Sequence, residues 1–162
     1  MKKLIALNII CFIMLSSCYK VPITNRKQFR LLHESIMLSM SLSTYNDFIR
    51  QNAPLPASHK DASMVKNVGK KMSDAVNNYL LKNGYKKVKN NYQWSFELVN
   101  NASVNAWCMP GGKIVFYSGI MPITLNESGI AVVMGHEMAH AVAKHGNERL
   151  SQQLAITLGG VS

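Results

Sequence analysis

Apolar residues recur every three or four positions along two long stretches of this chain, a spacing typical of helices with one buried face. In the first stretch, residues 28–51, the apolar positions are Phe29, Leu32, Ile36, Met40 and Phe48. In the second, which starts at a cap formed by Ser58 or Asp61 and ends at Gly84, they are Val65, Val68, Met72, Val76 and Tyr79. The pattern predicts two amphipathic helices, separated by the breaker Asn52-Ala53-Pro54-Leu55-Pro56.

A strand is predicted between residues 92 and 100, where apolar and polar residues alternate. The apolar members are Trp94, Phe96 and Leu98. Residues 103–118 then predict a hairpin, because Pro110-Gly111-Gly112 suits a tight turn between two apolar segments.

The residues from Ile130 to Ala143 are apolar on nearly every side, which predicts a buried helix. Asn126 is a suitable N-cap for it, and Gly146 stands at its expected end. A last helical segment is expected at about residues 148–158. The order of elements predicts one α+β domain that is mainly helical, with a small antiparallel sheet or hairpin packed beside the helix at 130–143.

Candidate chemistry lies in this buried helix, which contains His136-Glu137-Met138-Ala139-His140. Two histidines four residues apart on a helix lie one above the other, about 40° apart around its axis. Both imidazoles can therefore bind one metal ion, and Glu137 can contact a water molecule that the metal acidifies. The pattern predicts a zinc hydrolase site with His136 and His140 as ligands and Glu137 as base. The alternative is that both histidines are hydrogen-bonded members of the core.

The formal net charge of +10 is concentrated, because eight of the lysines lie between Lys60 and Lys89. A nucleic-acid-binding face would be one explanation, but aromatic residues are not interleaved with these lysines. We therefore expect a solvated helix face that rests near anionic lipid, and no nucleic-acid partner.

Four stretches of the sequence resemble a known family. They are Pro22-Ile23-Thr24-Asn25-Arg26-Lys27-Gln28, Asn105-Ala106-Trp107-Cys108-Met109-Pro110-Gly111-Gly112-Lys113-Ile114, Ser118-Gly119-Ile120, and Gly135-His136-Glu137-Met138-Ala139-His140 with His145-Gly146. In this order they resemble the zinc metallopeptidases grouped with the CaaX prenyl endopeptidase and HtpX, and above all their periplasmic, lipoprotein-type BepA-like members.

The resemblance implies a zincin-like fold and a role for each matching position. His136 and His140 would bind one Zn²⁺ per chain, and Glu137 would be the general base and proton shuttle. The substrate-binding positions would be Asn105, Ala106 and Trp107. They would lie on an edge strand, where an extended polypeptide binds by strand addition. The alternative for these three positions is a plain strand end with a core tryptophan.

The resemblance also implies a third zinc ligand, a glutamate in a Glu-x-x-x-Ala-Asp context on a later helix. That sequence is not found among the 162 residues, so we expect a domain truncated before the third ligand. His145 is nine residues after His136, about 180° around the same helix, so we expect it to point away from the metal. The direction of Glu148 cannot be extrapolated past the expected helix end. We expect Cys108 to be a small core hydrophobe, and a third metal ligand is the alternative.

The N-terminus resembles that of an exported bacterial lipoprotein. Met1-Lys2-Lys3 precedes the apolar residues 4–15, a run too short to span a bilayer. Leu15-Ser16-Ser17-Cys18 resembles a lipobox, in which Cys18 carries the lipid anchor, and an ordinary signal peptide is the alternative. The expected organisation is a signal peptide at 1–17, a linker at 18–27 and a partial zinc metallopeptidase domain at 28–162. Tyr19 favours the outer over the inner membrane, on the periplasmic side of the cell envelope.

Two functions stay open from the sequence. The first is a metalloendopeptidase that cleaves unfolded or misassembled envelope proteins, by analogy with the family. The second is a degenerate relative that binds peptides or partners without cleaving them, because two ligands hold zinc more weakly than three.

Overall fold

Within residues 18–21 and 23–159, the part of the chain that the computed structural model describes, there are six α-helices and five short strands. In chain order the elements are β1 (Cys18–Lys20), β2 (Lys27–Phe29), α2 (Glu34–Gln51), α3 (Lys60–Lys82), α4 (Lys86–Lys89), β3 (Ser95–Val99), β4 (Ala106–Met109), β5 (Lys113–Tyr117), the 3₁₀ turn η1 (Ser118–Ile120), α5 (Met121–Thr124), α6 (Glu127–Val142) and α7 (His145–Gly159). The expected signal peptide at 1–17 lies outside the described residues. No helix in the described part is both long and apolar enough to cross a bilayer.

Both predicted amphipathic helices are present, as α2 and α3. Helix α3 has its predicted stripe in the core and ends just before Gly84, whose φ is +79°. The predicted start of the first helix at Gln28 is wrong, because Lys27–Phe29 pairs with β1 as a strand. Helix α2 begins instead after His33. The segment interpreted as a linker, residues 18–27, thus includes β1 and the first residue of β2.

The central sheet has the strand order β3-β5-β4. Strands β4 and β5 form the predicted antiparallel hairpin, and Gly112 N–H closes its turn by donating to the Met109 carbonyl at 3.0 Å. Pro110 followed by Gly111 with φ +91° matches a type II turn. The sheet is mixed rather than antiparallel throughout, since β3 runs parallel to β5. The chain reverses once after β3 and again at the hairpin, which returns β5 to the direction of β3.

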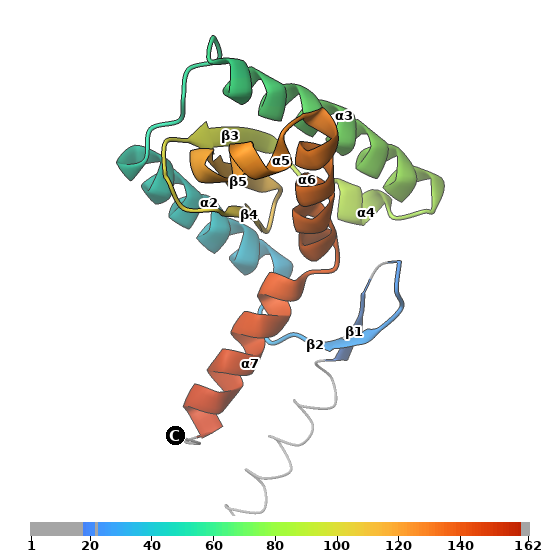
Figure 1. The fold of residues 1–162 in the computed structure, drawn as a ribbon. Helices are drawn as coiled ribbons and strands as arrows, with labels where there is room; N and C mark the ends of the chain where they lie inside the picture. The colour runs from blue at the N-terminus through green and yellow to red at the C-terminus, as the bar shows by residue number, and fades with distance from the viewer. Residues whose placement is uncertain (1–17, 22, 160–162) are drawn as a thin grey trace, which may run out of the picture.

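The core lies between the sheet and the pair α3 and α6 (Figure 1). Its fully buried residues include Val65 of α3, Ile114 and Phe116 of β5, and Ile130 and Met134 of α6. Helix α2 packs against the sheet through the ring of Phe48, which contacts Trp107 and Tyr117, and α7 runs away from this body (Figure 1). The mainly helical α+β class predicted from the sequence is confirmed.

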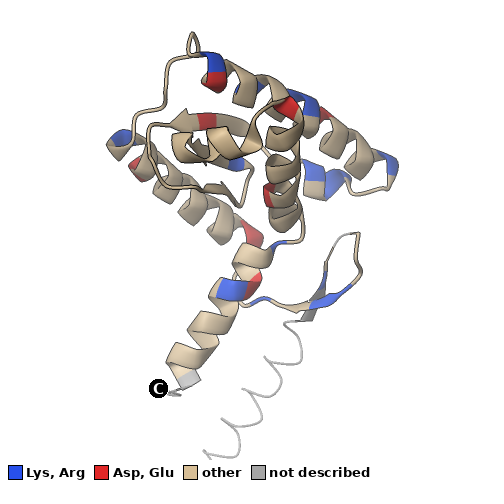
Figure 2. Cartoon of the chain, viewed as in Figure 1, with Lys and Arg blue, Asp and Glu red and all other residues tan. Residues whose placement is uncertain are grey.

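Lysines gather along α3 and at α4, as Figure 2 shows. Most are exposed, as expected for a solvated face. Two of them pair with carboxylates, Lys66 with Glu97 at 3.1 Å and Lys71 with Glu127 at 2.8 Å. The expected proximity of this face to anionic lipid stays a prediction.

Candidate metal centre

Helix α6 carries the candidate residues, and its N-cap and its buried side chains hold it in place. At its start, the Asn126 side-chain oxygen accepts a hydrogen bond from Gly129 N–H at 3.1 Å, as predicted for the N-cap. Along its length, Ile130, Met134 and Met138 are buried in the core. These contacts fix the position of the helix and its rotation about its axis.

One face of α6 is open, so the expectation of burial on all sides is wrong for that face. Val132 is 74% exposed, and His136 and Ala139 are also exposed. Next to them, Gly135 lies close to α3, where a Cβ atom would be 3.2 Å from Met72 Cε. Apolar composition predicted a covering layer, but no described segment packs over this face.

The rings of His136 and His140 converge, as the four-residue spacing predicts. Their Nε2 atoms are 2.9 Å apart, and the two ring planes are nearly perpendicular at 89°. His136 is exposed and His140 is half-buried, so the pair stands at the edge of the core rather than inside it. This geometry disfavours the alternative of two core histidines, and their role as ligands stays a prediction.

The histidine pair fits a zinc ion. Zn–N bonds are about 2.0–2.1 Å long, so two nitrogens bound at the tetrahedral angle lie about 3.3 Å apart. The observed 2.9 Å is slightly shorter, a difference that small rotations of the rings would close. In the described part of the chain, no group of three His, Cys, Asp or Glu side chains is placed to share one ion. These residues would therefore supply two of the three protein ligands that a catalytic zinc takes.

His145 lies beside His140, which corrects the prediction that it points away. That prediction assumed a continuous helix, but α6 ends at Val142 and Lys144 takes a left-handed conformation with φ +57°. Helix α7 then starts in a new direction (Figure 1), and the Nδ1 atoms of His140 and His145 are 2.6 Å apart. Burial, and after it the neighbouring His140, lowers the pKa of His145 below its ordinary value.

Glu137 lines a cavity of about 210 Å³, together with His140, Trp107 and Cys108. The candidate base and one candidate ligand therefore line the same cavity. Burial raises the pKa of the Cys108 thiol, and the charge of Glu137 raises it further. Cys108 thus keeps its proton and packs against the core, which favours the interpretation of a small core hydrophobe.

A larger cavity of about 680 Å³ also borders the histidine pair. His136, His140 and His145 form one part of its wall. The rest is mostly apolar and comes from α3, from α6 and from the loop between β1 and β2.

Strand β4 is an edge strand, as predicted for residues 105–107. Tyr117 N–H donates to the Asn105 carbonyl at 3.0 Å, and paired residues alternate along an antiparallel ladder. Ala106 and Cys108 therefore direct their backbone N–H and C=O groups toward the free edge. The Trp107 ring instead packs edge-on against Phe48 of α2, with ring centroids 5.0 Å apart. The binding role of Asn105, Ala106 and Trp107 stays a prediction.

Glu148 points toward the β1–β2 hairpin and is not available as a third ligand. Its two carboxylate oxygens accept hydrogen bonds from Arg26 at 2.9 and 2.5 Å, and one also accepts from Gln28 at 3.0 Å. The hydrogen bond from Arg26 holds the pKa of Glu148 below its ordinary value.

This pair predicts a pH dependence of stability. The folded-state pKa of Glu148 is depressed, so its contribution is present above the unfolded-state pKa of about 4.3 and is lost as pH falls through the folded-state value. Arg26→Met should therefore lower the free energy of unfolding near neutral pH and lower it less in acid. Urea unfolding at both pH values measures this, with Arg50→Met as the control, because the pair of Arg50 with Asp47 on α2 is far more exposed and should contribute little. A deficit that does not change with pH would contradict the prediction.

His33 and His59, to which the sequence assigned no role, cap α2 and α3. Each ring accepts a hydrogen bond from the backbone N–H two residues later, that of Ser35 or Asp61. Histidine is not among the preferred caps, so Ser58 and Asp61 were the expected choices for α3. The contact of His145 was missed for a different reason, because it depends on where α6 ends. The predicted lipidation site Cys18 starts β1, and its side chain lies outside the described part of the structure.

Known proteins share this sequence pattern. Residues 59–161 match the model of peptidase family M48. The chain is 33% identical over 152 residues to mitochondrial metalloendopeptidase OMA1 of Saccharomyces cerevisiae, which covers 88% of this chain and 42% of that protein. It is 28% identical over 139 residues to the protein of the same name in Schizosaccharomyces pombe, with 85% and 38% covered.

A third relative is the beta-barrel assembly-enhancing protease of Escherichia coli K12, 40% identical over 50 residues, with 31% of this chain and 10% of that protein covered. The chain spans less than half the length of all three relatives. The family match, in contrast, covers more than half of this chain and includes α6 with both histidines. The chain therefore belongs to peptidase family M48, a family of zinc-dependent metalloendopeptidases.

Proposed function

We propose that this chain is a zinc-dependent metalloendopeptidase that cleaves unfolded or misassembled proteins of the bacterial cell envelope. The observation that carries the proposal is the convergence of His136 and His140, whose Nε2 atoms are 2.9 Å apart, with Glu137 beside them on the same helix. Family membership supports peptidase chemistry. The substrate class is supported by the likeness to a protease named for β-barrel assembly.

His136 and His140 would hold the zinc ion through their Nε2 atoms. When bound, zinc supplies Lewis-acid chemistry, which polarises a carbonyl group and lowers the pKa of water. Glu137 accepts the proton of the attacking water molecule and passes it to the amine nitrogen when the peptide bond breaks. Glu137 and His140 line the same cavity, so a water molecule and the substrate amine nitrogen could reach Glu137 there.

The polypeptide substrate would lie along the free edge of β4. Backbone groups of Ala106 and Cys108 face that edge and can pair with an extended chain by strand addition. Asn105 and Trp107 would hold the strand in place, the first through its carbonyl bond to Tyr117 and the second through its packing on Phe48. An unfolded segment takes the extended form that this edge needs without losing other structure, which favours unfolded substrates.

We further propose a location on the periplasmic side of the envelope, with the membrane reached through a lipid on Cys18. The lipobox-like Leu15-Ser16-Ser17-Cys18 supports this, and Tyr19 favours the outer membrane. Protein quality control in the envelope would be the corresponding task.

The second candidate is a non-catalytic family member that binds peptides or partners. The observation in its favour is that the described residues bring only two candidate ligands together. Metal content and proteolysis distinguish the two functions.

The test uses the purified chain with Zn²⁺ and an unstructured protein such as casein. We expect one zinc per chain, cleavage that stops on addition of a chelator, and recovery when zinc is restored. His140→Ala should lose the zinc, and His59→Ser, which keeps a helix cap far from the site, should not. Zinc binding that depends on His140 without any cleavage would favour the second candidate.

A further inference from the structure

We propose that His145 is the positioning residue of this metal centre. Its Nδ1 accepts a hydrogen bond from Nδ1–H of His140 and so holds the other nitrogen of His140 toward the cation. The inference rests on the proposed zinc site and adds a residue that lies outside the His-Glu-x-x-His pattern.

The hydrogen positions follow from the proposed ligand atom. A histidine that binds metal through Nε2 carries its proton on Nδ1, and the partner of that proton sets the orientation of the ring. The Nδ1 atom of His145 lies 2.6 Å from Nδ1 of His140. A neutral imidazole has one donor and one acceptor, so His145 accepts at Nδ1 and keeps its own proton on Nε2.

Two nearby carboxylates, those of Glu148 and Glu34, are directed toward cationic side chains and not toward His140. Glu148 accepts hydrogen bonds from Arg26 and Gln28. Glu34 accepts from Arg30 and from Lys144, each at 2.7 Å. Metal-binding histidines usually have a carboxylate, a backbone carbonyl or water as partner, and here an imidazole occupies that place.

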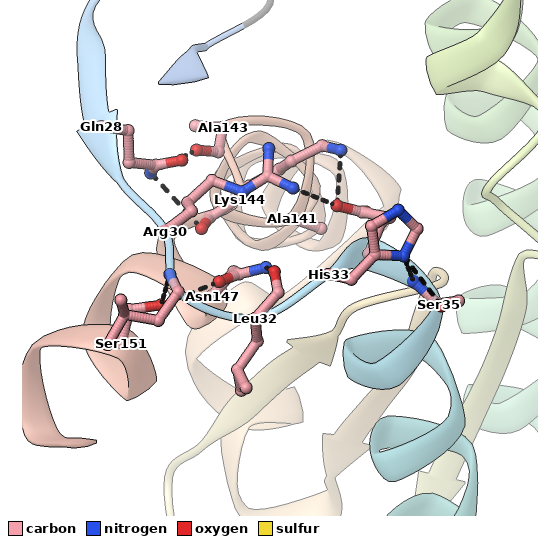
Figure 3. A network of polar contacts seen from close by, with 12 residues as sticks. Gln28, Arg30, Leu32, His33, Ser35, Ala141, Ala143, Lys144, Asn147 and Ser151 are labelled. Atoms are coloured by element: carbon pink, nitrogen blue, oxygen red, sulfur yellow. Dashed lines mark hydrogen bonds and ion pairs between the residues drawn. The ribbon is translucent and has the colours of Figure 1, made fainter. Parts of the chain in front are cut away.

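His145 lies at the turn that connects α6 to α7. Hydrogen bonds with residues 28–32 hold this turn in position (Figure 3). Gln28 is buried, and its amide nitrogen donates to the carbonyls of Ala143 at 3.0 Å and Lys144 at 3.4 Å. The left-handed backbone of Lys144 is unfavourable for a residue with a side chain, so surrounding contacts must stabilise it. The Gln28 bonds do this at the residue where the chain turns.

The first turns of α7 are hydrogen-bonded to the same N-terminal residues. Asn147 donates to the Leu32 carbonyl at 3.0 Å, and Ser151 accepts from Leu31 N–H at 2.9 Å (Figure 3). These bonds set the direction in which α7 leaves α6. They also give the family-like stretch at residues 22–28 a physical role, since Arg26 and Gln28 hold the turn that brings His145 to His140.

The test is a Zn²⁺ titration of the full chain in competition with a chromophoric chelator. His145→Leu, which has similar bulk and no acceptor, should weaken zinc binding about tenfold or more, the usual cost of losing such a partner. His145→Asn places an oxygen where Nδ1 stands and should retain most of the affinity. His140→Ala reports loss of a ligand, and His59→Ser controls for removal of a remote imidazole.

Equal weakening by His145→Leu and His145→Asn, or no change in either, would overturn the proposal. So would a loss in both that equals the loss in His140→Ala, because His145 would then be a ligand itself. Failure of the metal centre gives a different result, in which His140→Ala binds zinc as well as the unmodified chain. Thermal unfolding without metal checks that each variant is folded. If His145→Leu is not, His145→Ala takes its place in the comparison with His145→Asn.

Discussion

Replacing Glu137 by glutamine is expected to lower the rate of peptide-bond cleavage by about 10²- to 10⁴-fold, the range that general acid–base catalysis supplies. Glutamine has nearly the same shape as glutamate but cannot take a proton from water. Because His136 and His140 are unchanged, zinc binding should stay the same. Cleavage of an unstructured protein, followed beside the zinc content of the same sample, measures both quantities.

The matched control is Glu127→Gln, in the first turn of the same helix. Glu127 is exposed and pairs with Lys71 on α3, away from the histidines. Its replacement should leave the cleavage rate nearly unchanged. Cleavage by Glu137→Gln at the rate of the unmodified chain would remove Glu137 from the role of base, whatever the metal content.

Phe116→Ala is expected to have the largest effect on stability, lowering the free energy of unfolding by about 3–5 kcal/mol. Phe116 is fully buried on the central strand β5 and packs in the core beneath α6. Alanine would leave a cavity in this cluster of buried side chains, which close-packed surroundings fill only in part. Urea unfolding monitored by circular dichroism gives the difference.

Val132→Ala is the control for loss of apolar volume. Val132 lies on the open face of α6 and is 74% exposed, so its replacement should change the free energy of unfolding by less than about 0.5 kcal/mol. A loss at Val132 as large as that at Phe116 would show that a further segment covers this face in solution. It would also contradict the expected ranking of the two positions.

Features that depend on short-range geometry were predicted correctly from the sequence. The N-cap at Asn126 and the convergence of His136 with His140 involve residues three or four positions apart on one helix. Helix periodicity alone sets such contacts. The hairpin of β4 and β5 is similar, because its turn residues lie between the two strands that it joins.

Features that depend on distant segments were missed. The parallel pairing of β3 with β5 brings together strands that are separated by the whole of β4. The start of α2 was placed too early, because Phe29 fits the helical spacing of the residues after it but pairs with Cys18 in a strand. The spacing of apolar residues does not indicate that Phe29 pairs with Cys18.

What this sequence determined by itself is the zinc-site pattern, its place on an apolar helix and the family to which the chain belongs. Each of these depends on residues close together in the chain or on their order. Only the tertiary structure decided that His145 meets His140. That contact requires a break in the helix at Lys144, which is stabilised by hydrogen bonds from Gln28, 115 and 116 positions away. Periodicity describes a helix while it continues, and contacts from remote segments decide where it stops and which way the chain then turns.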